Sequence, residues 1–269
     1  LGERRIWVAI KPHYPTEPDM EICESKLFKR NEGFYLHVVV RKEIEPKTGC
    51  NDVLAIDLGI HNIAVTANSK TKEVHFYGKR LRAVRGHYFH LRRKLPNRRA
   101  VKKVGKHEKR IINHELHKIS KTIVLEANRT NSVTVMGKLK SMRKNGNGKG
   151  RRFNRKLNSF SYAKLSSYIR YKAEWLGIPV LTISEANTSK KCSLCGREGL
   201  RHNGLFKYSC GAKLSVDYNG AKNIMKRALG KLHAEPLSSV GAEVNQPRTT
   251  PTDSLSPMMR MEAPCESLG

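Results

Sequence analysis

Two aspartates stand where a carboxylate could bind a metal ion. Asp57 lies in an otherwise apolar run, Val53–Leu58, and Gly59 comes soon after it. A carboxylate buried in such a run is costly unless it is paired or bound to a metal. Asp217 falls where a helix is predicted to begin, and there the ordinary role of an Asp is N-capping. Taken singly, Asp57 fits a capping role as well as a metal-binding one, whereas for Asp217 N-capping is the preferred interpretation.

Three of the six cysteines are clustered. Cys192 and Cys195 form a C-x-x-C, and Cys210 follows 15 residues later. Clustered cysteines favour metal binding over disulfides in a reducing compartment, which the absence of a signal-type N-terminus indicates. A redox pair is the alternative interpretation of the C-x-x-C. Cys23, Cys50 and Cys265 are interpreted as unpaired structural or tail thiols.

The charge of the chain indicates a polyanionic partner. Its 269 residues carry 52 Lys+Arg against 23 Asp+Glu, a net charge of +29. Nucleic acid is the commonest partner of so basic a protein, and an anionic membrane is the competing one. There is no 18-residue apolar run, so the composition excludes a membrane span. It also excludes a coiled-coil rod and a wholly disordered chain.

The elements that must position these residues alternate between strand and helix. Strands are predicted at 5–10, 33–40 (after a turn at 29–32), 53–59, 62–67, 131–137 and 178–183. Helices are predicted over 81–125, broken at Pro96, and over 160–176 and 219–229. This is an α/β fold. Ligand groups collect at the carboxyl ends of its parallel strands.

Three motifs together resemble the C-terminal half of TnpB. They are residues 55–66 (AIDLGIHNIAVT), 188–196 (TSKKCSLCG) and 215–224 (SVDYNGAKNI). Residues 117–121 (HKISK), 152–158 (RFNRKLN) and 171–177 (YKAEWLG) also match. TnpB is the RNA-guided, RuvC-type nuclease encoded by OrfB-type insertion sequences, and it is similar to the nuclease half of the miniature type V CRISPR effectors. The resemblance covers roughly residues 20–230.

The resemblance implies an RNase H-like (RuvC-type) fold in which three acids hold two Mg²⁺ (or Mn²⁺) ions at the scissile phosphate. Asp57 matches the first acid and Asp217 the last. The middle Glu is replaced by Gly137, with Lys138 beside it. Either the nuclease is inactive or another carboxylate has taken this role. Glu185, at the end of the strand before the cysteines, is the best substitute, whereas Glu126 is expected to face solvent.

The cysteine segment resembles the family's zinc ribbon. Cys192, Cys195 and Cys210 match zinc ligands, and Lys207 stands where the remaining cysteine is expected. His202 is the nearest candidate for a fourth ligand, with water or a degraded site as alternatives. The basic segments predict phosphate contacts to an RNA–DNA heteroduplex. The residues proposed to make them are Arg92, Arg93, Lys94, Arg98, Arg99, Lys140, Arg143, Lys144, Arg151 and Arg152.

These observations predict five regions. They are a partial β-rich WED-like (OB-like) domain (1–48), a RuvC-like core with a basic helical insertion (49–187), a zinc ribbon (188–214), a final motif helix (215–231) and a disordered tail (232–269). The predicted function is DNA cleavage guided by a transposon-encoded RNA, in a prokaryotic cytoplasm near the nucleoid. The alternatives are a nuclease-dead, RNA-guided DNA-binding protein or repressor, and a degenerate product that does neither.

Overall fold

The computed structural model describes residues 19–30, 33–138, 150, 154–155, 161–184, 188, 190–202, 204–208, 210–211 and 213–234. The chain divides into two compact units at the junction of Glu43 and Ile44. The predicted strand at 5–10 and the predicted tail beyond residue 234 lie outside the described residues. None of the described helices has the length and apolar character needed to cross a bilayer.

In its described part, the first unit consists of two small antiparallel pairs. β1 (Glu21–Ile22) pairs with β4 (Val40–Arg41), and β2 (Lys26–Arg30) pairs with β3 (Gly33–His37). The strand predicted at 33–40 is therefore confirmed over 33–37. The turn predicted at 29–32 was placed too early, because Lys29 pairs with Phe34 and Arg30 with Gly33 in the β2–β3 ladder.

A five-stranded sheet in the order β7-β6-β5-β8-β9 forms the centre of the second unit. Its strands are β5 (Asp52–Asp57), β6 (Ala64–Asn68), β7 (Val74–Tyr77), β8 (Ser132–Lys138) and β9 (Val180–Ser184). β5, β8 and β9 are parallel, whereas β6 and β7 continue the sheet antiparallel from β5. The predicted β5–β6 hairpin is confirmed. The short edge strand β7 was not predicted.

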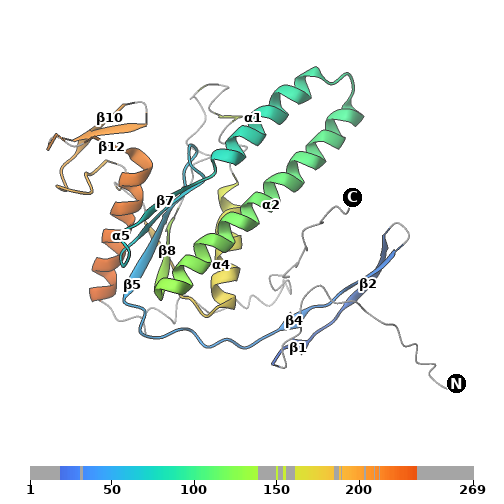
Figure 1. Cartoon of the computed structure of the whole chain (residues 1–269), viewed down its shortest axis with the longest axis horizontal. Helices are drawn as coiled ribbons and strands as arrows, with labels where there is room; N and C mark the ends of the chain where they lie inside the picture. Colours follow the sequence, from blue (N-terminus) through green and yellow to red (C-terminus); the bar gives the residue numbers. More distant parts are fainter. Residues whose placement is uncertain are drawn as a thin grey trace. The chain divides into compact units, whose positions relative to one another are not determined.

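Helices cover both faces of this sheet (Figure 1). α5 (Val216–Ala234) packs Ala221, Ile224 and Ala228 against Val53, Ala55, Val133, Val135 and Ile183. On the other face, α2 (Arg98–Thr130) and α4 (Tyr162–Trp175) cover Leu54, Ile56 and Met136. Along β5 the residues facing α5 therefore alternate with those facing α2, as the pleat of a strand requires. In this alternation Asp57 follows Ala55 on the α5 face.

α1 (Lys79–Lys94) and α2 form an antiparallel hairpin that extends from the sheet (Figure 1). The predicted break at Pro96 is confirmed. Leu95 has extended backbone angles (φ −83°, ψ 135°) because the ring of the following proline disfavours a helical residue before it. Asn97 then caps α2, its side-chain oxygen accepting from Ala100 N at 2.8 Å. Such a cap contributes about 1 kcal/mol to helix stability.

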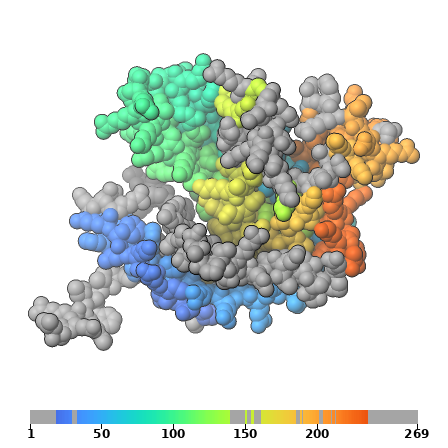
Figure 2. Space-filling view, turned by 180° about the vertical axis from the view of Figure 1, so that it is seen from behind, coloured from blue at the N-terminus to red at the C-terminus, as the bar shows by residue number. Residues whose placement is uncertain are grey.

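A three-stranded antiparallel ribbon precedes α5. Its strands are β10 (Gly199–His202), β11 (Leu205–Tyr208) and β12 (Lys213–Ser215). Cys192, Phe206, Tyr208 and Val216 form its small core. The ribbon and the tip of the α1–α2 hairpin lie on opposite sides of the unit in both views (Figures 1 and 2). α5 starts at Val216, three residues before the predicted start.

Candidate metal centres and nucleic-acid surface

Asp57 is the last residue of β5, at the carboxyl end of the parallel strands. It pairs with Val65 of β6, and the preceding Ile56 pairs with Met136 of β8. The run Val53–Ile56 is fully buried, whereas Asp57 is only partly buried. The strand therefore delivers one carboxylate to the rim of the sheet, where it is accessible to ions from solvent.

Asp217 lies in the first turn of α5 and comes to the same place. Its Oδ2 accepts a hydrogen bond from Asn62 Nδ2 at 2.8 Å. A β-carbon at Gly59 would lie 3.5 Å from Asp217 Oδ1, so this carboxylate lies against the turn that follows β5. That turn is closed by Gly59 N donating to Asn62 O at 3.1 Å. The two acids predicted from the sequence therefore both lie where β5 and the turn after it pack against the start of α5, although they are far apart in the chain.

The third predicted acid, Glu185, lies outside the described residues. The structure does describe the strand that leads to it. Ser184, the last residue of β9, accepts a hydrogen bond at its carbonyl from Arg227 of α5. β8, between β5 and β9, ends in Gly137 and Lys138, which pair with Ile183 and Ser184. The middle parallel strand thus contributes no carboxylate at this rim.

The expectation that Glu126 faces solvent is wrong. Glu126 is 9% exposed and accepts a hydrogen bond from Asn68 Nδ2 at 3.5 Å. Burial raises the pKa of its carboxyl, against the lowering effects of His75 and Asn68. The residue belongs to α2, whose inner face packs on the sheet, and the helical periodicity there turns position 126 inward. Glu126 is therefore a structural carboxylate.

The three predicted zinc ligands are brought together. The Sγ atoms of Cys192, Cys195 and Cys210 all lie within 4.8 Å of one another. Zn–S bonds are about 2.3 Å long, so one ion can reach all three sulfurs from a central position. Among the described residues, this is the one group of three or more His, Cys, Asp or Glu side chains whose ligand atoms lie close enough to share an ion. The donor set and its spacing fit zinc.

The turn that contains Cys192 and Cys195 (residues 190–195, called the knuckle below) places backbone N–H groups where they can stabilise a thiolate at Cys192. Leu194 N and Cys195 N both donate to Cys192 Sγ, at 3.3 and 3.4 Å. Burial acts to raise the pKa of Cys192, but these amides and the neighbouring thiols outweigh it and lower the pKa. Cys192 is buried, whereas Cys195 and Cys210 are exposed. Two backbone amides thus favour the thiolate form of the buried sulfur.

A fourth protein ligand is not assigned. The side chain of His202 lies outside the described residues, and Lys207 is an exposed residue of β11. Cys23 and Cys50 are free thiols separate from the cluster, and Cys50 Sγ donates to Asn131 Oδ1 at 3.4 Å. Cys265 lies outside the described residues.

Tyr208, which the sequence analysis did not single out, lies beside the cluster. Its side chain is 6% exposed and packs with Cys192. Among the described residues its hydroxyl has no hydrogen-bond partner. Burial and the three nearby thiols raise the pKa of Tyr208. In the sequence, only its position two residues before Cys210 indicates that Tyr208 lies near the cysteine cluster.

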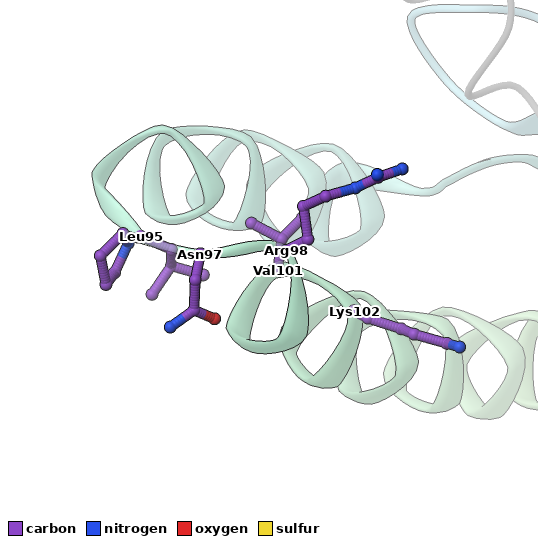
Figure 3. Close-up of a pocket in the computed structure, with 6 residues that line it drawn as sticks. Leu95, Asn97, Arg98, Val101 and Lys102 are labelled. Atoms are coloured by element: carbon purple, nitrogen blue, oxygen red, sulfur yellow. The ribbon is translucent and has the colours of Figure 1, made fainter.

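The tip of the α1–α2 hairpin is basic and open. Leu95, Pro96, Asn97, Arg98, Val101 and Lys102 line a pocket of about 620 Å³. In Figure 3 the side chains of Arg98 and Lys102 extend from the first two turns of α2. Arg93, Lys94, Arg98 and Arg99 are exposed, which suits contact with a polyanion. Arg92 differs, since it forms an ion pair with Glu108.

The remaining predicted phosphate contacts cannot be placed. Lys140, Arg143, Lys144, Arg151 and Arg152 all lie outside the described residues. Of the same basic segment, Arg155 is described, and its guanidinium lies 3.8 Å from the centre of the Phe89 ring on α1. One arginine of the segment therefore contacts the hairpin.

Comparisons with known proteins agree with this architecture. Residues 162–224 match the family model described as Cas12f1-like, TNB domain. Over 96 residues, 36% of this chain, the sequence is 38% identical to a TnpB-like protein of Methanocaldococcus jannaschii. Over 85 residues, 30% of this chain, it is 39% identical to the CRISPR-associated endodeoxyribonuclease Cas12f1 of Sulfoacidibacillus thermotolerans. These matches cover 34% and 20% of the two relatives.

The fold itself is shared with a solved structure. Cas12f1 in a cryo-EM structure of its complex with sgRNA and target DNA superposes with a TM-score of 0.56 at 21% identity. The match covers 78% of this chain and 56% of that one. The chain is thus similar in sequence to TnpB-like and Cas12f proteins, and its residues 162–224 match the TNB domain of the latter. It spans about half the length of the solved relative.

Proposed function

We propose that the chain is the catalytic part of an RNA-guided, RuvC-type DNA endonuclease. The observation that carries this proposal is the meeting of Asp57 and Asp217 at the carboxyl end of the parallel strands. Clustered hard oxygen ligands suit Mg²⁺ or Mn²⁺. Two such ions would activate the attacking water and stabilise the leaving oxygen. Under this proposal the chain holds the carboxylates in position to bind the ions, and the hydrogen bond from Asn62 fixes the carboxylate of Asp217.

Glu185 completes the proposed acid triad. Leu181 and Ile183 of β9 face α5, and Glu185 follows Ile183 two residues later in the sequence. β8 lies between β5, which ends in Asp57, and β9, which leads to Glu185. Its residue at this level of the sheet is Gly137, which pairs with Ile183 and has no side chain to separate the two acids. Arg227 holds the end of β9 to α5, the helix that carries Asp217. The three acids would thus share one helix-covered rim.

The nucleic-acid partners follow from charge and from the relatives. The net charge of +29 requires a polyanion, and the exposed basic residues of the hairpin offer a surface for one. The solved Cas12f1 that shares the fold holds a guide RNA and target DNA. We assign the same pair of partners, a transposon-encoded guide RNA and a DNA target, to this chain, which would act in a prokaryotic cytoplasm.

The test is cleavage of labelled single-stranded DNA by the full chain in Mg²⁺ or Mn²⁺. Asp57→Ala, Asp217→Ala and Glu185→Ala should each lower the rate by more than about 100-fold, since even a partner that only supports a metal ligand is worth about 10–100-fold. Glu73→Gln, an exposed acid remote from the rim, is the matched control. Cleavage that survives Glu185→Ala would remove Glu185 from the site.

A nuclease-dead, RNA-guided DNA-binding protein is the second candidate. The observation that favours it is the end of β8, where Gly137 lies on the same face as Asp57 and supplies no carboxylate to the proposed centre. Under this proposal the folded wild-type chain binds RNA and DNA with a steep salt dependence. It cleaves neither, and Asp57→Ala changes nothing in binding.

A further inference from the structure

The first two turns of α5 contact several partners at once. Val216 N donates to Gly204 O of the ribbon at 3.1 Å, and its side chain joins the ribbon core. Asp217 is held by Asn62, and Gly220 lies against the carboxylate of Asp57. Between these residues, Asn219 is 0% exposed. Both metal centres therefore contact the same short stretch of helix.

Asn219 makes a two-sided contact with the cysteine knuckle. Its Oδ1 accepts from Ser193 N at 2.7 Å, and its Nδ2 donates to Lys191 O at 2.8 Å. Lys191 and Ser193 are the residues on either side of Cys192. The amide of Asn219 thus fixes the backbone at both flanks of the buried ligand sulfur. The amide of an asparagine carries its donor and its acceptor on separate atoms, so it can bond both flanks at once.

Asn223, one turn later, reinforces the contact. Its Nδ2 lies within hydrogen-bonding distance of Thr188 O (2.7 Å) and Lys191 O (2.8 Å). Together the two asparagines join Thr188, Lys191 and Ser193 to the helix. A helix turn is stiff, because its backbone hydrogen bonds fix neighbouring residues relative to one another. A displacement of the knuckle is therefore transmitted to Asp217 and Gly220, which flank Asn219.

We propose that Asn219 is a positioning residue that couples the two metal centres. Zinc at Cys192, Cys195 and Cys210 raises the affinity of the Asp57–Asp217 centre for divalent ions through α5. This inference rests on the proposed function only in requiring that the acid centre binds such ions. Neither the family resemblance nor the comparisons assign a role to Asn219.

Coupling of this kind is reciprocal. If zinc strengthens Mn²⁺ binding by some factor, Mn²⁺ strengthens zinc binding by the same factor. Couplings between sites in proteins are typically about 5–150-fold. Because the contact consists of two short hydrogen bonds to a fully buried amide, we expect a factor of about tenfold or more. Asn219→Ala removes both bonds; Lys191 O keeps the bond from Asn223, whereas the bond that Ser193 N makes to the side chain of residue 219 is lost.

The experiment measures Mn²⁺ affinity in the full chain by electron paramagnetic resonance, with zinc bound and after zinc removal by a chelator. Wild type should lose about tenfold or more in Mn²⁺ affinity when zinc is removed. Asn219→Ala should bind Mn²⁺ with the weaker affinity in both states. Asn113→Ala is the matched control, since Asn113 contacts Lys164 on the far helices and neither metal centre. It should retain the full zinc effect.

A second measurement tests reciprocity and does not depend on the variant folding. Zinc affinity of the wild type, measured by chelator competition, should rise with saturating Mn²⁺ by the factor found above. In hydrogen exchange, zinc removal should lower protection at residues 216–223 of α5 as well as at 190–195. Protection unchanged over 216–223 would overturn the coupling.

Failure of the inference is distinguishable from failure of the proposed function. Mn²⁺ binding that Asp57→Ala abolishes, but that zinc does not affect, would overturn the coupling and leave the acid centre intact. Absence of Mn²⁺ binding by folded, zinc-loaded wild type would overturn both.

Discussion

Gly220 lies against the carboxylate of Asp57, so closely that a β-carbon at position 220 would lie 3.1 Å from Asp57 Cγ and closer still to one of its oxygens. The carboxylate of Asp57 thus occupies space that is open only because residue 220 of α5, the helix that carries Asp217, has no side chain. Asp57 comes from β5 and Gly220 from α5, and the packing of these two elements sets the separation of the two carboxylates. This relationship gives a direct test of the centre.

Gly220→Ala should displace the Asp57 carboxylate. Forcing an extra carbon into a packed site costs about 1–3 kcal/mol, whereas Ala in a helix gains about 1 kcal/mol over Gly. We therefore expect a small net change in stability and a loss of at least about tenfold in Mn²⁺ affinity. Thermal unfolding and electron paramagnetic resonance measure the two effects separately.

Gly230→Ala is the control for this substitution. Gly230 is in the same helix, and a β-carbon there meets no atom within 4 Å. This variant should be about 0.5–1 kcal/mol more stable than wild type, with unchanged ion binding. Equal Mn²⁺ affinities for the two variants would show that Gly220 does not set the position of Asp57.

Zinc binding should depend on the three clustered cysteines. Purified protein is expected to hold about one zinc ion per chain, because the three sulfurs are spaced for a single shared ion. Cys192→Ser and Cys210→Ser should each lower this content, while Cys23→Ser, outside the cluster, should leave it unchanged. Elemental analysis after dialysis measures the content. A full zinc content in Cys192→Ser would contradict the assignment.

The hairpin should carry part of the electrostatic affinity for nucleic acid. Arg98→Ala, Arg99→Ala and Lys102→Ala should each weaken RNA and DNA binding and reduce the slope of log K against log salt by about 0.7–0.9, the loss of one phosphate contact. Arg92→Ala should change the slope less, because Arg92 is paired with Glu108. Fluorescence anisotropy over a salt series measures the slopes. Slopes unchanged in all variants would remove the tip from the binding surface.

The strongly periodic elements could be predicted from the sequence, and some of the contacts could not. Asp57, Asp217 and the cysteine cluster were identified because each stands in a recognisable local pattern. The strand β7 escaped detection because it is a four-residue edge strand, too short for a clear alternating pattern. Glu126 was misplaced although the helical periodicity of α2 puts it on the face that packs against the sheet, because a carboxylate was expected to face solvent and its partner Asn68 comes from a distant strand.

The supporting residues of the site were missed for the same reason. Asn219, Gly220 and Asn62 act through contacts that exist only after β5, α5 and the knuckle have come together. From the sequence alone, Asn219 is expected to be a solvent-facing helix residue. Gly220 is expected only to lower the stability of the helix. Their roles come from what lies opposite them, which neither periodicity nor composition encodes.

Lys172 should give the protein a pH-dependent stability in the alkaline range. Its ammonium donates to His117 O and Ser120 Oγ between α4 and α2. Burial, with a smaller effect of Lys121, lowers its pKa from 10.5 to about 8. Between these two values the unfolded chain binds more protons than the folded one, so the contribution of Lys172 to the free energy of unfolding rises with pH.

Lys172→Met keeps much of the side-chain volume and removes the ionisable group. The difference in unfolding free energy between wild type and this variant should therefore shift in favour of wild type as pH rises from about 8 towards 10.5. Urea unfolding of both proteins at pH 7, 8, 9 and 10 measures the difference. The other titratable groups are the same in both proteins, so their contributions to the free energy of unfolding cancel. A difference that stays constant over this range would mean that Lys172 keeps its ordinary pKa in the folded chain, and that the α2–α4 contact leaves its ammonium hydrated.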